Sequence, residues 1–369
     1  MMRVFVSATS IVSGGALNIL KQFILNCKPS VDFIIAINSK LELEPEYTNK
    51  TNISFVKVVE NSRLERVKWD FWKAKKKISK LKGNVSLVIS LQNTTLNVGD
   101  IRQMVYVHQG LFLHEKSWNP FVASERKYAF YKYIYPRFIF AFSKPTTQFI
   151  VQTEWMRNAL INKYRVPNSN VFNFKPEIVP WSDKELLSVD NNSNEELTLF
   201  YPATGEVFKN HLLLLESIKT LHYKYLSLGN SLNLKLILTI DVNLEANEHI
   251  HNYLKENPNI RQFCEFTGPI SYEQVKRYYD SCDVVTFSSS IESFGLPLLE
   301  AAMLGKHVLS LDTSFAKEVL EGYEGVDFIG DDPSLWAEYL NRLLESDNSH
   351  NPQFVPKYQT SWHDFFELM

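Results

Sequence analysis

Short apolar and β-branched runs alternate along the chain with longer stretches in which apolar residues recur every three to four positions. The short runs have the length of buried strands, and the longer stretches have the period of amphipathic helices. Such alternation is typical of βαβ units built around a parallel sheet. The pattern therefore predicts an α/β fold.

The pattern predicts strands and helices in both halves of the chain. In the first half the predicted strands are 3–8, 32–37, 53–59, 85–90, 103–108 and 149–152, and the predicted helices are 16–26, 63–82, 122–142 and 154–164. In the second half the predicted strands are 197–201, 234–240, 262–266, 284–287, 307–311 and 327–329, and the predicted helices are 211–225, 245–256, 272–282, 297–304, 315–321 and 333–345. Each half can form one parallel-sheet domain.

A polar stretch separates the two halves. Residues 179–196 contain the run DNNSNE and cannot bury a core, so they are predicted to be a linker between an N-terminal domain, 1–178, and a C-terminal domain, 197–352. The last segment, 353–369, contains the aromatic run WHDFF and is predicted to be helical and to pack back on the N-terminal domain. Two such domains imply a cleft between them, where a ligand would bind.

Composition agrees with this division and removes several classes of function. A chain of 369 residues has the size of two ordinary domains. Its 45% hydrophobic and 22% charged residues exclude wholesale disorder, and its net charge of −2 gives no general affinity for nucleic acid. The N-terminus becomes polar soon after Val6 and no apolar run is long enough to span a bilayer, so neither a signal peptide nor a membrane-spanning helix is expected.

The cysteines and acidic residues give no sign of a metal site. Cys27, Cys264 and Cys282 lie far apart and form no C-x-x-C pair, which favours a reduced, cytoplasmic protein without disulfides or zinc. No D-x-D motif stands out at a strand end in the first half. We therefore expect no metal requirement.

Three joints between a strand and a helix carry residues suited to binding phosphate, because helix N-termini present unpaired amides. The first joint contains Gly14 and Gly15, which either form a tight turn or let a ligand approach the backbone closely. A full G-x-G-x-x-G fingerprint is absent.

The second joint places a cation beside a helix start. Lys209 precedes Asn210, which is predicted to cap the helix that begins at His211. A cation at this end is disfavoured by the helix dipole unless an anion lies between them. Lys209 is thus either a solvated loop residue or part of an anion site.

The third joint carries two carboxylates. Glu292 lies in the loop and Glu300 one turn into the helix, while Pro297 suits the first turn and Gly305 suits the C-terminal stop. Taken singly, Glu292 reads as a solvated loop acid and Glu300 as a complement to the helix dipole. Together they are expected to face the same site.

This third joint resembles the hallmark E-x(7)-E motif of the retaining glycosyltransferases of family 4, which have the GT-B fold. The motif reads ESFGLPLLEAA from Glu292 to Ala302. The segments GPISYE at 268–273, YVHQ at 106–109 and VQTEWM at 151–156 are also similar to segments of that family, so the likeness covers nearly the whole chain. It implies two Rossmann-like domains whose parallel sheets face each other across a cleft.

The resemblance implies roles for the matched residues. Glu300 would bind the ribose of a nucleotide-sugar donor, Glu292 and His108 would contact the transferred sugar, and Lys209 would neutralise the diphosphate. The predicted catalytic residues are Glu292, Lys209 and His108, and the predicted donor-binding residues are Glu300, Phe294, Gly295, Leu296, Gly14, Gly15, Thr204 and Ser293.

One feature of the second joint departs from the family. Its members commonly carry an arginine a few residues before the diphosphate lysine, and residues 203–208 contain none. A variant with the P-A-x and K-N elements seen here occurs among relatives that build bacterial surface polysaccharides. The resemblance thus implies transfer of a hexose from a UDP- or GDP-sugar to a glycan or lipid-linked acceptor, as in O-antigen, capsule or lipopolysaccharide synthesis. There are two alternatives. One is a catalytically inactive scaffold that binds a nucleotide sugar, and the other is a GT-B epimerase that acts on the nucleotide sugar itself.

Two stretches of the N-terminal domain combine basic and aromatic residues. Arg63–Lys82 holds nine Lys or Arg with Trp69, Phe71 and Trp72, and Arg126–Lys144 has a similar mixture. Such stretches suit an anionic membrane surface, or they are solvated lysines beside core aromatics. The sequence predicts a cytoplasmic protein bound peripherally to the inner face of the plasma membrane.

Overall fold

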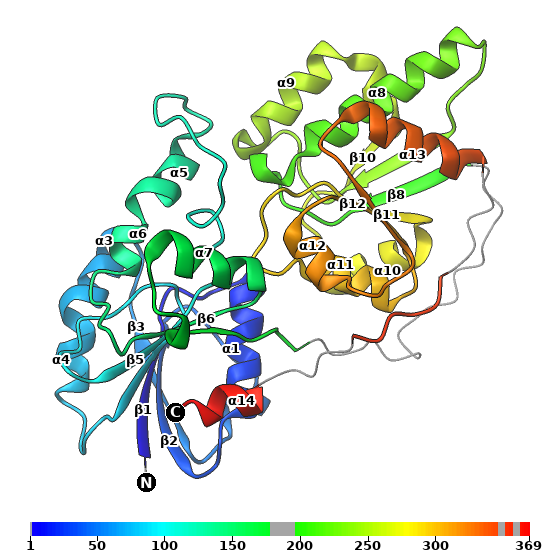
Figure 1. Ribbon diagram of the computed structural model, residues 1–369. Coiled ribbons are helices and arrows are strands. Elements are labelled where there is room, and N and C mark those ends of the chain that lie inside the picture. Colours follow the sequence, from blue (N-terminus) through cyan, green and yellow to red (C-terminus); the bar gives the residue numbers. More distant parts are fainter. Residues whose placement is uncertain (1, 178–195, 346–350, 357–361) are drawn as a thin grey trace. The chain divides into compact units, whose positions relative to one another are not determined.

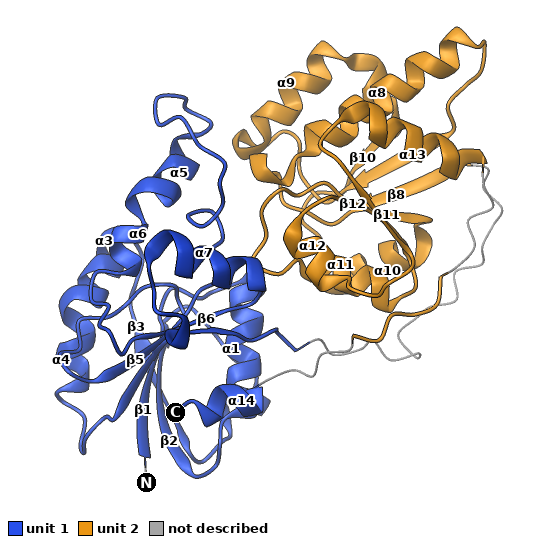
Figure 2. Ribbon diagram, viewed as in Figure 1, with its two compact units in different colours: residues 1–178, 359–369 blue, residues 179–358 orange. Residues whose placement is uncertain are grey.

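The computed structural model describes residues 2–177, 196–345, 351–356 and 362–369. The chain divides into two compact units: unit 1 contains residues 1–178 and 359–369, and unit 2 contains residues 179–358 (Figure 2). Most of the predicted linker, 179–195, lies outside the described residues. Residues 353–356, predicted to belong with the C-terminal segment, lie with unit 2 because Phe354 donates its backbone N–H to Ala302 and its ring contacts Tyr323.

Unit 1 is built on a seven-stranded sheet in the order β3-β2-β1-β4-β5-β6-β7. The strands are β1 (Met2–Ala8), β2 (Val31–Asn38), β3 (Ile53–Val58), β4 (Leu87–Ser90), β5 (Arg102–Tyr106), β6 (Gln148–Val151) and β7 (Val171–Asn173). All neighbouring pairs are parallel. The chain order reverses direction at β1, as in a Rossmann domain.

The helices of unit 1 connect these strands (Figure 1). They are α1 (Gly14–Asn26), α2 (Pro45–Thr48), α3 (Arg63–Lys68), α4 (Ala74–Ile78), α5 (Arg126–Ala129), α6 (Pro136–Ile139) and α7 (Glu154–Tyr164). A π-helical turn at Trp69–Lys73 joins α3 to α4, and another at Phe130–Ile134 leads from α5 towards α6. The predicted helices 63–82 and 122–142 are therefore shorter than expected and locally widened.

Alternate residues of β1 pack against different layers of unit 1. Val4 and Val6 belong to the core that includes α1, whereas Phe5 belongs to the core that includes Trp69 and Ala74. Successive side chains of a strand point to opposite faces, so the consecutive apolar residues from Val4 to Val6 reflect the covering of both faces of β1.

The C-terminal helix α14 (Trp362–Glu367) completes unit 1. Phe23 of α1 has its ring centroid 6.0 Å from Trp362, 5.9 Å from Phe365 and 5.3 Å from Phe366. Trp362 also donates its indole N–H to Gln22 over 3.1 Å. The WHDFF run therefore forms a helix whose aromatic face is buried in the core of unit 1.

Unit 2 contains a six-stranded parallel sheet in the order β10-β9-β8-β11-β12-β13. Its strands are β8 (Leu197–Tyr201), β9 (Leu234–Leu238), β10 (Cys264–Phe266), β11 (Val284–Phe287), β12 (His307–Leu311) and β13 (Val326–Ile329). Its helices are α8 (His211–Ser227), α9 (Glu248–Glu256), α10 (Tyr272–Ser281), α11 (Leu296–Met303), α12 (Ser314–Val319) and α13 (Pro333–Glu345). This is a second Rossmann-like domain.

Two predicted boundaries near the site were wrong, and one strand was missed. β5 ends at Tyr106, so His108 lies beyond the strand, in the loop that follows it. Helix α1 begins at Gly14, two residues before the predicted start. The short strand β7 was not predicted, because its three residues are too few to show a periodic pattern.

Candidate functional site

The predicted site residues divide between the two units. Gly14, Gly15 and His108 lie in unit 1, and the other residues lie in unit 2. In both units they follow the carboxyl ends of strands, where parallel sheets of this kind bind ligands.

In unit 2 the second and third joints lie side by side because β8 and β11 are neighbouring strands. Ser290 donates its backbone N–H to the Phe208 carbonyl over 2.8 Å, and the Ser288 hydroxyl donates to the Lys209 carbonyl over 2.9 Å. The Tyr201 hydroxyl also donates to the Lys209 carbonyl, over 2.7 Å. These bonds fix the backbone of Lys209 against the loop that carries Glu292.

Lys209 and Glu292 form an ion pair between the two joints. Their side chains are 17% and 15% exposed, so water screens the pair less than it screens a surface pair. A cation beside a helix N-terminus requires a nearby anion, and the Glu292 carboxylate is that anion for Lys209. Of the two sequence interpretations of Lys209, a freely solvated loop residue is wrong.

The loop before Lys209 is shaped by close packing and an unusual backbone. A Cβ on Gly205 would lie 1.7 Å from Oδ1 of the buried Asn247, so a larger residue there would displace the Asn247 side chain. Asn210 has a φ of 57° and makes no side-chain cap on α8, and its amide donates to Asp331 over 3.1 Å. Asn210 thus stands at the N-cap position that the sequence predicts, but its side chain bonds to Asp331 instead of capping the helix.

Helix α11 begins at the third joint as its sequence predicts. Gly295 stands immediately before the helix with a φ of 93°, which favours glycine, and Pro297 occupies the first turn. Phe294 is 2% exposed, so its side chain is a core residue and only its backbone could reach a ligand. Ser293 and Leu296 are half-buried beside it, and Thr204 is exposed in the neighbouring loop.

Glu300 is held by two tyrosines of α10 that sequence analysis did not select. Its carboxylate accepts hydrogen bonds from the Tyr272 hydroxyl at 3.1 Å and from the Tyr279 hydroxyl at 3.3 Å. Burial raises the pKa of Glu300, and the two hydroxyl donors oppose that rise. The two tyrosines fix the orientation of the carboxylate and leave each oxygen a second lone pair for a ligand hydroxyl.

In unit 1, Gly14 and Gly15 open helix α1. Gly14 has a φ of +70°, and a Cβ on either glycine would meet no atom within 4 Å. Ser13, just before the helix, makes no side-chain cap. The turn requires glycine at Gly14, and the space beside both glycines is consistent with the alternative interpretation, close approach of a ligand to the backbone.

His108 is held in one protonation state. Its ring stacks on Tyr106 at 4.7 Å, and its Nε2 lies 3.0 Å from the Leu91 carbonyl, which can only accept a hydrogen bond. Burial lowers the pKa of His108 to about 4. Near neutral pH the ring is therefore neutral and protonated on Nε2, and its Nδ1 is a hydrogen-bond acceptor.

A polar network near these residues was also missed. Arg66 of α3 bonds to Asp70 at 3.1 Å, lies 4.0 Å from Glu60 and donates to Ser10 of the first joint at 2.7 Å. Burial raises the pKa of Glu60 and Asp70, and the Arg66 guanidinium opposes this. Sequence analysis grouped Arg66 with the other basic residues of 63–82. Its side chain is only 14% exposed and points into the domain, which the composition of the stretch does not reveal.

Both basic stretches combine exposed and buried residues. In the first, Lys75, Lys76 and Lys77 are exposed and Trp72 is 62% exposed. In the second, Tyr128, Ala129, Lys132 and Ile139 are buried. Membrane attachment through them stays a prediction.

Among the described residues no helix is long and apolar enough to cross a bilayer, and no group of three His, Cys, Asp or Glu side chains could hold a metal ion.

Two Rossmann-like domains with all-parallel sheets define the class of this protein, the GT-B fold, and similar solved structures share it. HepE from Anabaena, in complex with UDP and glucose, is 14% identical with a TM-score of 0.62, over 94% of this chain and 90% of that one. WaaG, a glycosyltransferase involved in lipopolysaccharide biosynthesis, is 14% identical with a TM-score of 0.66, over 94% and 91%.

Sequence comparison finds a family match and several relatives for parts of the chain. Residues 183–355 match the family Glycosyl transferases group 1. The D-inositol 3-phosphate glycosyltransferase of Corynebacterium urealyticum is 34% identical over 116 residues, 30% of this chain and 27% of that protein. Its counterpart in Corynebacterium diphtheriae is 36% identical over 83 residues, 22% of this chain and 19% of that protein. The family match covers a little under half of this chain and lies within unit 2, and the matched segments span less than a third of these relatives.

Proposed function

We propose that the protein is a retaining glycosyltransferase of family 4 that transfers a hexose from a UDP- or GDP-sugar to a glycan or a lipid-linked acceptor. The observation that carries this proposal is the Lys209–Glu292 pair, fixed between two neighbouring strand ends beside the start of α8. The UDP bound in the HepE structure supports a UDP-sugar as the donor. WaaG and the galactosyltransferase WaaB, which is named for the outer core of lipopolysaccharide, support a role in surface polysaccharide synthesis.

The proposed chemistry needs a positive charge where the leaving group forms. Cleavage of the bond between sugar and diphosphate develops negative charge on the departing phosphate and positive charge on the sugar. Lys209 and the amides at the start of α8 would oppose the first charge, and the Glu292 carboxylate would face the second. Retention would follow from attack on the face that the diphosphate leaves, with the phosphate accepting the acceptor's proton. The chain would then contribute mainly positioning and electrostatics.

The direct test is a transfer assay with purified protein, nucleotide sugars and acceptor glycans. We expect release of nucleotide together with a heavier glycan, and turnover should persist in excess EDTA because Lys209 and helix amides replace a metal. The product should keep the anomeric configuration of the donor when examined by NMR. Loss of turnover that Mn²⁺ restores, or an inverted linkage, would contradict the proposal. Isomerised donor would identify an epimerase, and donor binding without turnover would identify a scaffold.

Replacement of Glu300 by glutamine is expected to raise the donor KM about 10- to 100-fold with little change in kcat. A hydrogen bond to a charged group contributes about 1.5–3 kcal/mol, and the ribose that Glu300 would hold does not change charge during the reaction. Steady-state kinetics with varied donor measure the split between KM and kcat. Glu256→Gln, at an exposed carboxylate in α9, is the matched control. An equal fall in kcat and kcat/KM would place Glu300 at the reacting centre instead of at the ribose.

A further inference from the structure

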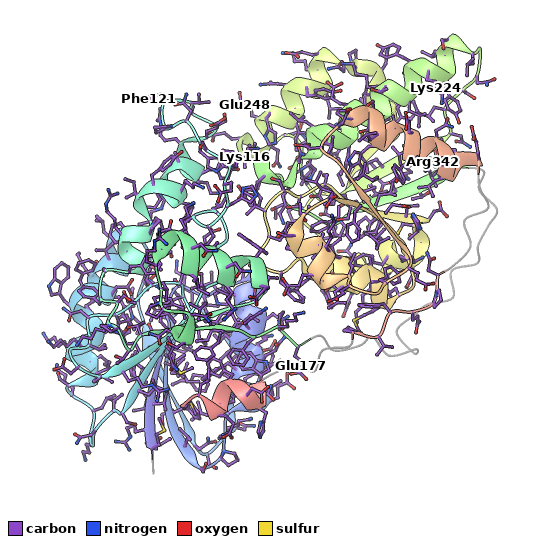
Figure 3. The ribbon with its side chains drawn as sticks, in the orientation of Figure 1. Lys116, Phe121, Glu177, Lys224, Glu248 and Arg342 are labelled. Carbon is purple, nitrogen blue, oxygen red and sulfur yellow. The ribbon has the colours of Figure 1, made fainter. Side chains whose placement is uncertain are left out.

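A group of basic side chains gathers around the loop that follows β5 in unit 1. The loop leads to α5, and in Figure 1 both lie beyond the end of the sheet opposite the N-terminus of β1. Lys116 projects from this loop and is labelled in Figure 3. Lys132 comes from the π-helical turn after α5, and Lys163 comes from the last turn of α7.

Lys132 is the buried member of the group. The residue is 8% exposed, and its ammonium donates to the backbone carbonyl of His114. Lys163 also donates to this carbonyl oxygen, over 3.4 Å. Two ammonium groups thus share one neutral acceptor. A buried ammonium ordinarily has a carboxylate partner, because removing a charge from water without one costs several kcal/mol.

The neighbouring side chains add further hydrogen-bond donors. Nδ1 of His114 accepts the backbone N–H of Lys116 over 3.1 Å, and burial together with Lys132, Lys116 and Lys163 lowers the pKa of His114. The neutral ring therefore carries its proton on Nε2, which is a further donor. The Trp155 ring lies 6.4 Å from that of His114, and its buried indole N–H has no acceptor within the described chain.

Acidic side chains do not balance these charges. Within the part of the chain that the structure describes, Glu115 is the acid whose charge acts on Lys132 and His114, and it is exposed. Lys132 and Lys163 thus converge on a single carbonyl, and Lys116 and His114 add a positive charge and a donor near them. That arrangement suits an anion with several acceptor oxygens.

We propose that Lys132, Lys163 and His114 form a binding site for a phosphate or diphosphate group carried by the acceptor. This rests on the proposed function, since an acceptor exists only if the protein is a transferase. A glycan phosphate and a lipid diphosphate offer the same oxygens, and the site takes either. The site lies in unit 1, apart from the Lys209–Glu292 pair of unit 2.

The charge state of Lys132 supports the site and gives it a pH signature. Burial, followed by the neighbouring Lys163, lowers the pKa of Lys132 to about 8, and Glu115 opposes this. The ammonium is therefore charged below about pH 8 and increasingly neutral above it. A bound anion favours the charged form, so its affinity should be full below about pH 8 and fall as the pH rises through that value.

The experiment is calorimetric titration with inorganic pyrophosphate at constant ionic strength. The reference protein carries Lys209→Met, which removes the predicted diphosphate affinity of unit 2. Three further substitutions are made in this reference protein. Two are Lys132→Met and Lys163→Met, and the matched control is Lys57→Met at an exposed position of β3. Lys163 is exposed, so Lys163→Met should fold even if Lys132→Met does not. Titration with a short isoprenyl diphosphate in the same variants distinguishes a lipid source from a glycan phosphate.

We expect Lys132→Met and Lys163→Met each to weaken pyrophosphate binding at least about 10-fold, and Lys57→Met to leave it unchanged. Sulfate keeps the same charge between about pH 7 and about pH 9, so a change in its affinity reports on the protein. Sulfate should bind more weakly at about pH 9 than at about pH 7, and this difference should disappear in Lys132→Met. Equal affinity in all four proteins, or no binding, would overturn the site. Titration of the wild type with UDP tests the donor site separately, so a failure of the proposed function would be recognised as such.

Discussion

Replacement of Lys209 by methionine is expected to lower kcat about 100-fold, which corresponds to about 3 kcal/mol of lost transition-state stabilisation. The loop at residues 203–208 contributes no arginine, so the leaving diphosphate would depend on Lys209 and on neutral amides. The charge of the leaving group is largest in the transition state, so kcat should fall more than donor affinity. Steady-state kinetics with varied donor measure both, and circular dichroism checks the fold.

The ion pair complicates the interpretation of a single substitution. Removing Lys209 also leaves Glu292, which is 15% exposed, without its partner. The variants Lys209→Met, Glu292→Gln and their double mutant form a cycle that separates the two effects. Lys219→Met, at a lysine of α8 paired with Glu216, is the control. Normal turnover of Lys209→Met would show that another cation serves the diphosphate.

Replacement of Phe23 by alanine is expected to lower the free energy of unfolding of unit 1 by about 3–5 kcal/mol. Phe23 is fully buried and its ring contacts those of Phe33, Trp362, Phe365 and Phe366. The cavity would open between the sheet and α14, so the loss should include detachment of the C-terminal helix. Urea denaturation followed by tryptophan fluorescence measures the change.

The control for this prediction lies on the same helix. Leu25 is 47% exposed, so Leu25→Ala should change stability by less than about 0.5 kcal/mol. Deletion of residues 359–369 should destabilise unit 1 to a similar degree as Phe23→Ala. If Phe23→Ala and Leu25→Ala had equal effects, the aromatic cluster would not hold α14.

Much of the fold could be predicted from the sequence because parallel sheets bury both faces of their strands. The runs at β8, β11 and β12 consist mostly of apolar and β-branched residues, and their predicted bounds agree with the structure. Short elements such as β7 and the π-helical turns carry no periodic signal of their own. Packing against neighbouring elements decides them, so the pattern did not predict them.

For the site, the sequence by itself determined which residues stand at the strand ends, because glycine and proline mark those joints locally. Gly295 and Pro297 start α11 where the pattern predicted a helix, since their backbone preferences act within a few residues. The same local argument placed Asn210 correctly before α8 but did not predict the partner of its side chain. Its amide donates to Asp331, 121 residues away in the sequence, instead of capping the helix.

Only the tertiary structure decided the charge partners. Lys209 and Glu292 are 83 residues apart and meet because β8 and β11 are neighbours in the sheet. Tyr272 and Tyr279 reach Glu300 from another helix, and Lys132 and Lys163 meet at the carbonyl of His114 from separate elements. Hydrophobic pattern and turn chemistry are local properties that a sequence displays directly. An ion pair or a shared carbonyl depends on strand order and helix packing, which bring together residues that no local pattern relates.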